Sequence, residues 1–191
     1  MKSLGVCIGS STLSFVTLEG DINSFKEVDV KRVFHNGDSK GELKKTFQSL
    51  NIESYDRICI TGKKLRHSLN LSSIMEPEAV ENAIEYIIED KTKYNILVNA
   101  GGETTLIYEI DRNGKIANVL TGNKCASGTG SFFIQQLGRM SIDIKDLKDS
   151  YLDIPNYEVS GRCSVFCKSD CTHALNKGTP KDSVVAGLCK M

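Results

Sequence analysis

The chain has 191 residues, 40% of them hydrophobic and 25% charged, which is enough apolar material to bury a globular core. Lysine plus arginine number 24, as do aspartate plus glutamate, so the chain has neither a basic excess for nucleic acid nor an acidic tail. No apolar run approaches the ~20 residues of a membrane span, and the N-terminus lacks the apolar segment of a secretory signal. We therefore expect a cytoplasmic protein with no nucleic-acid or membrane partner.

The first half of the chain predicts a small α/β unit. Apolar or alternating patterns predict strands in residues 4–9, 13–18, 28–34 and 55–61. Helical periodicity predicts helices in residues 39–50, with Ser39 as N-cap, and 78–90, with Pro77 at its start. The polar stretch 63–73 is predicted to be irregular.

A repeat of pattern follows. Residues 96–99, 106–110 and 116–120 are predicted strands, and aligning Gly9 with Gly101 superposes Val6 on Val98 and Leu18 on Ile110. Each copy has a glycine turn after its first strand. The first glycine turn is Gly9, Ser10, Ser11 and Thr12, and the second glycine turn is Gly101, Gly102, Glu103 and Thr104. The repeat predicts two similar lobes, residues 1–93 and 94–191, with both glycine turns available to nucleotide phosphates; tight strand connections are the simpler alternative.

A third glycine-rich segment, residues 121–131, lies between the strand at 116–120 and an apolar helical pattern at 132–137. Strand, glycine-rich turn and helix together present backbone N–H groups and a positive dipole end to an anion. Cys125 lies within this segment, in a setting that lowers the pKa of a thiol and favours a metal ligand or nucleophile.

Seven cysteines without a secretory signal make a poor disulfide framework. The patterns around three of them, Cys7, Cys59 and Cys189, predict small buried hydrophobes. Another three, Cys163, Cys167 and Cys171, are spaced by four on a helix predicted to run from Ser160 or Gly161 to Asn176, a spacing that disfavours ligation by all three. Cys163 lies at the start of this helix, like Cys125 before the other one. From the residues alone, ligation by this pair and ordinary partly buried thiols remain alternatives, while His35, His67 and His173 lack a partner at metal-ligand spacing.

Two motifs carry a resemblance to a known family. Lys124-Cys-Ala-Ser-Gly-Thr-Gly130 and Arg162-Cys-Ser-Val-Phe-Cys-Lys-Ser-Asp170 resemble the Cys-Ala-Ala-Gly-Thr-Gly and Cys-Thr-Val-Phe-Ala-Glu-Ser motifs of the activator ATPases of 2-hydroxyacyl-CoA dehydratases and benzoyl-CoA reductases. The resemblance covers most of the chain and is closest to long, multi-module members. It implies an α/β fold of duplicated ribonuclease H-like lobes around an ATP cleft, the actin-like ATPase fold, with the second lobe incomplete at the C-terminus.

The resemblance also implies cofactors, partners and site residues. In the family, one [4Fe–4S] cluster bridges a homodimer, and the matching ligands here are Cys125 and Cys163. ATP with Mg²⁺ drives a low-potential electron from the cluster into a 2-hydroxyacyl-CoA dehydratase-like iron–sulfur protein, with ferredoxin or flavodoxin as donor and an anaerobe as host. The residues expected at the phosphates are those of the first and second glycine turns together with Gly128, Thr129 and Gly130.

The sequence departs from the family in its phosphate turns. A family Asp is replaced by Cys7, a Lys is missing near Ser14, and Asn99 and Thr104 replace two further carboxylates. Glu103 is the acid that remains in these turns and is the candidate catalytic residue. Loss of Mg²⁺-binding carboxylates weakens hydrolysis more than it weakens backbone contacts to phosphate. Enzymatic activity is therefore left open. One alternative is a degenerate, non-hydrolysing lobe that holds the cluster or the dimer, and another is a small-molecule kinase, which needs a general base that neither turn offers.

Overall fold

The structure, a computed structural model, describes residues 1–21, 24–62, 66–67, 69–122, 130–161 and 163–191. These residues form two compact units. The first comprises Met1–Leu97 and Ile107–Val119, and the second comprises Val98–Leu106 and Leu120–Met191. The lobe boundary at residues 93–94 stays a prediction.

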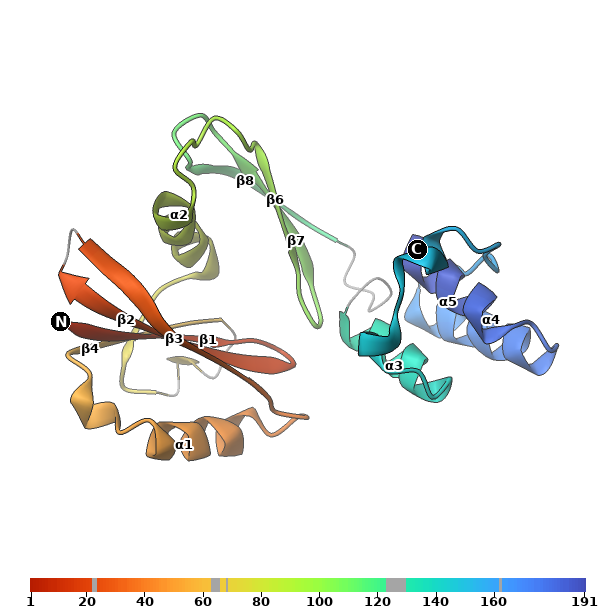
Figure 1. Cartoon of the computed structure of the whole chain (residues 1–191), viewed down its shortest axis with the longest axis horizontal. Coiled ribbons are helices and arrows are strands. Elements are labelled where there is room, and N and C mark those ends of the chain that lie inside the picture. The colour runs from red at the N-terminus through yellow and green to blue at the C-terminus, as the bar shows by residue number, and fades with distance from the viewer. Residues whose placement is uncertain (22–23, 63–65, 68, 123–129, 162) are drawn as a thin grey trace. The chain divides into compact units, whose positions relative to one another are not determined.

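The first unit contains a five-stranded sheet in the order β3-β2-β1-β4-β5 (Figure 1). Its strands are β1 (Lys2–Ile8), β2 (Thr12–Asp21), β3 (Ser24–Phe34), β4 (Arg57–Gly62) and β5 (Ser72–Ser73). The β1–β2 and β2–β3 pairs are antiparallel, whereas β1–β4 and β4–β5 are parallel. The carboxyl ends of β1, β4 and β5 therefore lie at one edge of the sheet, the edge from which the first glycine turn leaves β1.

Burial alternates along β1 from one face of this sheet to the other. Leu4, Val6 and Ile8 are 1–2% exposed and belong to a core that includes Phe15 of β2 and Leu43 of the helix α1 (Ser39–Ser49). Side chains of a strand alternate between faces, so Cys7 points to the opposite face. The second helix of the unit, α2 (Glu76–Ile87), lies across the sheet from α1 (Figure 1).

The starts of two predicted helices need correction. Asp38, not Ser39, caps α1, because its carboxylate accepts the N–H of Gly41 at 2.9 Å. The helix predicted from Ser160 or Gly161 begins at Ser164 instead, since the Asp170 carboxylate accepts the N–H of Ser160 at 3.0 Å and Cys163 has extended backbone angles.

The repeat's second copy forms a three-stranded sheet of order β6-β7-β8. Its strands are β6 (Ile96–Ala100), β7 (Thr105–Ile110) and β8 (Ile116–Thr121). The turn before β8 is closed by Asp111, whose carboxylate accepts the N–H groups of Asn113 and Lys115, both at 2.9 Å. Gly114 in this turn has a positive φ of 79°, which favours glycine.

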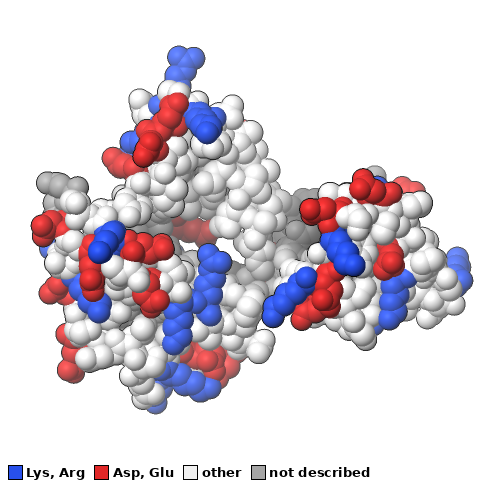
Figure 2. Space-filling model, in the orientation of Figure 1, with Lys and Arg blue, Asp and Glu red and all other residues white. Residues whose placement is uncertain are grey.

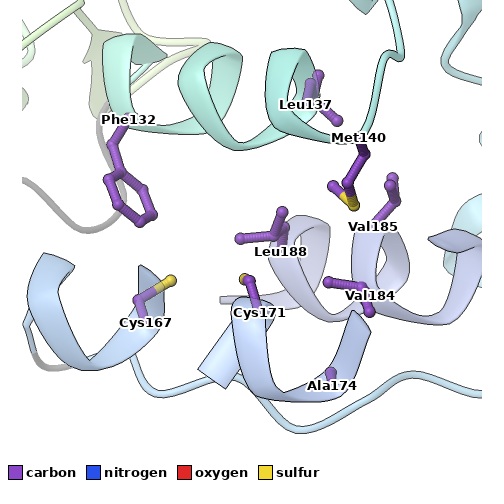
Figure 3. Packing of buried hydrophobic residues seen from close by; sticks show 9 residues of the cluster. All are labelled: Phe132, Leu137, Met140, Cys167, Cys171, Ala174, Val184, Val185 and Leu188. Atoms are coloured by element: carbon purple, nitrogen blue, oxygen red, sulfur yellow. The ribbon is translucent and has the colours of Figure 1, made fainter. Parts of the chain in front are cut away.

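Three helices build the core of the second unit (Figure 3). They are α3 (Gly130–Arg139), α4 (Ser164–Asn176) and α5 (Lys181–Lys190). Short 3₁₀ turns lie at Ile144–Asp146 and Asp149–Leu152, and one at Ile52–Ser54 belongs to the first unit. Gly187 permits a close approach, because a Cβ there would overlap the carbonyl oxygen of Tyr157. This core fixes α4, the helix that carries the cysteine row.

The face of the molecule seen in Figure 2 carries charges of both signs. Basic and acidic side chains are interspersed on the face seen in Figure 2, in agreement with the net charge of zero. No helix among the described residues is both long and apolar enough to span a bilayer.

Candidate functional site

The first glycine turn closes tightly between β1 and β2. The N–H of Gly9 donates to the carbonyl of Thr12 at 2.9 Å. A Cβ on Gly9 would lie 2.8 Å from the same carbonyl oxygen, closer than any ordinary carbon–oxygen contact. Glycine at this position is therefore required by the turn itself.

The second glycine turn has the same geometry. The N–H of Gly101 donates to the carbonyl of Thr104 at 2.9 Å, and a Cβ on Gly101 would lie 2.8 Å from that oxygen. The Thr Oγ1 atoms are also equivalent, at 3.6 Å from the Gly9 Cβ position and 3.7 Å from that of Gly101. The pattern repeat in the sequence thus corresponds to two turns of matching structure.

The start of α3 rests on the second glycine turn. The N–H of Gly130 donates to the carbonyl of Gly101 at 3.1 Å, and the N–H of Ser131 donates to that of Gly102 at 2.9 Å. The first N–H groups of a helix have no partner within the helix, and in α3 two of them bind the second glycine turn. Gly128 and Thr129 lie outside the described residues, so a phosphate-binding role for the segment 128–130 stays a prediction.

A pocket of about 260 Å³ in the second unit brings Glu103 together with the first turns of α3 and α4. Its lining consists of Glu103, Ser131, Phe132, Gln135, Ser164, Val165 and Lys168. The candidate catalytic residue therefore shares a pocket with the residue that follows Cys163. The pocket holds one acidic and one basic side chain, Glu103 and Lys168, and its other polar groups are hydroxyls and an amide.

Cys163 is the N-cap residue of α4, whereas the sequence predicts it within the first turn of a helix that begins at Ser160 or Gly161. It has extended backbone angles, φ −150° and ψ 132°, it is half-buried, and its carbonyl accepts the N–H of Cys167 at 2.9 Å. Cys163 therefore stands at the N-terminal end of α4, where the helix dipole is positive. Cys125 lies outside the described residues.

The other two cysteines of α4 are core residues. Cys167 is 0% exposed and Cys171 is 1% exposed, and both thiols point into the space between the helices (Figure 3). Burial, aided by the neighbouring Cys171, raises the pKa of Cys167 to about 12. Burial also raises the pKa of Cys171. Both thiols are therefore neutral at physiological pH, whereas metal ligation requires the thiolate.

The three cysteines predicted to be small buried hydrophobes, Cys7, Cys59 and Cys189, are less buried than expected. Cys189 is exposed on α5, so the prediction of a buried hydrophobe is wrong there. The apolar pattern of that segment belongs to Val184, Val185 and Leu188, on the other side of the helix. Cys7 and Cys59 are half-buried in the sheet.

The surroundings of Cys7 include a carboxylate that sequence reasoning missed. Burial raises the pKa of the Cys7 thiol, and the charge of Glu76 raises it further. The hydroxyl of Tyr108, a fully buried residue of β7, donates to Oε1 of Glu76 at 3.4 Å. Glu76 begins α2 soon after β5, which runs parallel to β4 and ends at the same edge of the sheet as β1. Nothing in the local sequence distinguishes Glu76 from the other acids of α2.

The arrangement of possible donor groups bears on metal binding. Within the described ranges, no three His, Cys, Asp or Glu side chains are placed to hold a metal ion. An iron–sulfur cluster shared by two chains needs two thiolates from each. Cys163 fits as one of these donors, and the second donor expected, Cys125, lies in the segment that is not described. The lack of a Cβ on Gly9 and Gly101 lets each turn close on itself, and glycine turns of this kind offer backbone N–H groups to phosphate.

No family model matches the chain. Individual proteins do match over nearly all of it. A protein of Methanocaldococcus jannaschii called uncharacterized protein MJ0004 is 28% identical over 188 residues, which cover 97% of this chain and 74% of that protein. The 2-hydroxyisocaproyl-CoA dehydratase activator of Clostridioides difficile is 22% identical over 192 residues, covering 98% of this chain and 71% of the activator.

Solved structures agree with the sequence matches. The activator of the 2-hydroxyisocaproyl-CoA dehydratase from Clostridium difficile, solved with bound ADPNP, has a TM-score of 0.80 at 23% identity and covers 98% of this chain and 70% of its own. The chain resembles the 2-hydroxyacyl-CoA dehydratase activators. Component A of the (R)-2-hydroxyglutaryl-CoA dehydratase of Acidaminococcus fermentans follows with a TM-score of 0.76 at 20% identity, over 98% of this chain and 73% of that one. The predicted α/β fold of duplicated ribonuclease H-like lobes, the actin-like ATPase fold of these activators, is confirmed. Incompleteness of the second lobe stays a prediction.

Proposed function

We propose that this protein is an ATP-dependent activator of a 2-hydroxyacyl-CoA dehydratase-type enzyme. The observation that carries the proposal is the pocket in which Glu103 of the second glycine turn meets the first turn of α4, the helix capped by Cys163. The turn that we assign to the nucleotide and the helix capped by Cys163 thus line one pocket of the second unit. The similarity to dehydratase activators in sequence and fold supports the same role.

Nucleotide binding is assigned to the two glycine turns. Their N–H groups would bind phosphate oxygens of ATP, as backbone N–H groups of glycine turns do in other phosphate sites. Mg²⁺ prefers carboxylate and phosphate oxygens. Because Cys7, Asn99 and Thr104 supply no carboxylate, Glu103 is the acid that the two turns retain to orient the metal or water.

A cluster is assigned to Cys125 and Cys163. Two such pairs from two copies of the chain give the four thiolates of one [4Fe–4S] cluster, which would store the electron accepted from ferredoxin or flavodoxin. The neutral, buried thiols of Cys167 and Cys171 favour Cys163 as the ligand from α4. Val165 and Phe166, next to Cys163, are 70% and 64% exposed, so a second copy that covers this end of α4 would bury apolar surface.

Communication between nucleotide and cluster follows from the contacts of the second glycine turn. Its carbonyls at Gly101 and Gly102 accept the first N–H groups of α3, and its Glu103 lines the pocket beside Ser164. A displacement of this turn on ATP binding or hydrolysis would therefore move the first residues of α3 and α4. ATP hydrolysis would supply the free energy, and the chain's own residues would transmit the movement to Cys163.

A second candidate function is a degenerate, non-hydrolysing lobe that holds the cluster or the dimer. The specific observation in its favour is the absence of carboxylates at Cys7, Asn99 and Thr104. It predicts nucleotide binding without turnover, because the backbone contacts to phosphate do not depend on these side chains.

ATP hydrolysis by anaerobically purified protein separates the two candidates. The activator proposal predicts steady turnover that Glu103→Gln reduces at least tenfold, while Glu109→Gln, an exposed acid of β7, leaves it unchanged. ATP binding with no turnover in the wild-type protein would favour the degenerate lobe. An ATP-dependent reduction of a dehydratase-type iron–sulfur partner, measured by its absorbance, then tests electron delivery.

A further inference from the structure

His35 is a buried polar side chain that the proposed mechanism leaves unused. It follows β3 directly and is 6% exposed. The sequence offers no reason to connect it with the glycine turns, since 23 or more residues separate it from the first of them. The structure nevertheless places both its main chain and its ring against that turn.

Two hydrogen bonds connect His35 with the first glycine turn. Its backbone N–H donates to the carbonyl of Ser11 at 3.2 Å. Its ring nitrogen Nε2 lies 3.4 Å from the carbonyl oxygen of Gly9. One residue therefore holds two carbonyls of the turn, one through the main chain and one through the imidazole.

A third contact fixes the tautomer of the ring. The N–H of Gly37 points at Nδ1 of His35 at 3.1 Å, and a backbone N–H can only donate. Nδ1 is therefore the acceptor nitrogen, and the proton of the neutral ring is on Nε2. It follows that Nε2–H donates to the Gly9 carbonyl, which is a bond the opposite tautomer could not make.

Because each peptide unit is planar, the bond to the Gly9 carbonyl also orients the N–H group on the opposite side of that peptide. In a planar trans peptide the C=O of one residue and the N–H of the next point in opposite directions. A fixed Gly9 carbonyl therefore fixes the direction of the Ser10 N–H. A fixed Ser11 carbonyl likewise fixes the direction of the Thr12 N–H. Both N–H groups are then directed away from His35.

His35 is itself held by the start of α1. Its carbonyl accepts the N–H of Asp38 at 2.7 Å, and the Asp38 carboxylate caps α1 through Gly41. The helix α1 is anchored in the core by Leu43, which is 3% exposed. Hydrogen bonds between His35 and Asp38 and between Asp38 and Gly41 thus link the first glycine turn to α1, which Leu43 anchors in the core.

We propose that His35 is the positioning residue of the first glycine turn, whose Nε2–H holds the Gly9 carbonyl so that the Ser10 N–H is directed at a nucleotide phosphate. The inference rests on the proposed nucleotide-binding role of this turn. Preorganised donors bind anions more tightly than donors that must first be ordered, because the ordering cost is already met in the free protein. His35 therefore acts on affinity without touching the nucleotide.

Two amide substitutions separate the two ring nitrogens. Gln places an amide N–H donor near the position of Nε2, whereas Asn places an amide oxygen near that of Nδ1 and no donor within reach of Gly9. His35→Gln keeps the bond to the turn and loses the one to Gly37, which is exposed and can bond to water. His35→Asn keeps the acceptor for Gly37 and loses the bond to the turn.

The experiment is ATP binding to the full chain by isothermal titration calorimetry, with thermal unfolding measured on the same samples. We expect His35→Asn to raise the Kd for ATP about tenfold, the equivalent of one hydrogen bond, and His35→Gln to stay within about threefold of wild type. His173→Asn, at an exposed position of α4, is the matched control and should bind like wild type.

The outcomes distinguish this inference from the proposed function. Equal affinities of His35→Asn and wild type overturn the role of His35, and so do equal losses in the Asn and Gln variants that parallel a fall in melting temperature. Failure of the wild-type protein to bind ATP overturns the nucleotide-binding proposal instead.

Discussion

Replacing Gly9 by alanine should weaken nucleotide binding by a predictable amount. The added Cβ would lie 2.8 Å from the Thr12 carbonyl oxygen, and an ordinary contact begins at 3.4 Å, so the turn must open by about 0.6 Å. A phosphate hydrogen bond of ~2.9 Å lengthened by that amount is effectively lost. Hydrogen bonds to charged groups contribute about 1.5–3 kcal/mol, so the Kd for ATP should rise about 10- to 150-fold.

The assay is calorimetric titration with ATP, and two further alanine variants control it. Gly101→Ala meets the same 2.8 Å contact in the second glycine turn and should lose affinity in the same range. Gly138→Ala has no neighbour within 4 Å on α3, so it should bind like wild type and gain up to about 1 kcal/mol in stability. Unchanged affinity in both turn variants would refute the assignment of the glycine turns to phosphate binding.

Three further predictions concern packing and thiol chemistry. Gly187→Ala should lower the free energy of unfolding by about 1–3 kcal/mol, because its Cβ overlaps the Tyr157 carbonyl; an unchanged melting temperature would contradict the close packing of α5. The folded-state pKa of Cys167, about 12, lies above the unfolded value of 9.0, so the contribution of its neutral thiol to stability is lost as the pH rises from about 9 to about 12. In Cys167→Ala, the free energy of unfolding measured by urea denaturation should fall less steeply between pH 9 and pH 12 than in wild type. An equal fall in both proteins would contradict burial of the Cys167 thiol. Removal of the Glu76 charge in Glu76→Gln should lower the pKa of Cys7 and speed its alkylation by iodoacetamide at pH 8, whereas an unchanged rate would show that Glu76 does not act on Cys7.

Much of the fold follows from local patterns in the sequence. The buried alternation of β1 and the repeat of glycine turns predict both sheets, because period-2 patterns and glycine turns depend on neighbouring residues. β5 (Ser72–Ser73) escapes prediction, since two serines carry no strand pattern and pair with Cys59 and Ile60 through the main chain alone. β3 begins at Ser24 instead of residue 28, because its polar first residues pair with β2 at an exposed edge.

The candidate site was predicted less completely than the fold. Cys163 and Glu103 could be selected because they lie in motifs, and the structure adds that Glu103 shares a pocket with Ser164, the residue after Cys163. Glu76 and His35 could not be selected, because their roles depend on contacts between segments distant in sequence. Its place at the start of the helix and its match to the family motif singled out Cys163, but only packing shows that Cys167 and Cys171 are enclosed in the core.

Iron and acid-labile sulfide in anaerobically reconstituted protein test the central claim most directly. The account predicts about two iron atoms per chain, one [4Fe–4S] cluster per dimer, with most of the iron lost in Cys125→Ser and in Cys163→Ser. Cys189→Ser, an exposed cysteine of α5, serves as the control and should retain the wild-type content. Wild-type iron in both Cys125→Ser and Cys163→Ser would contradict the account.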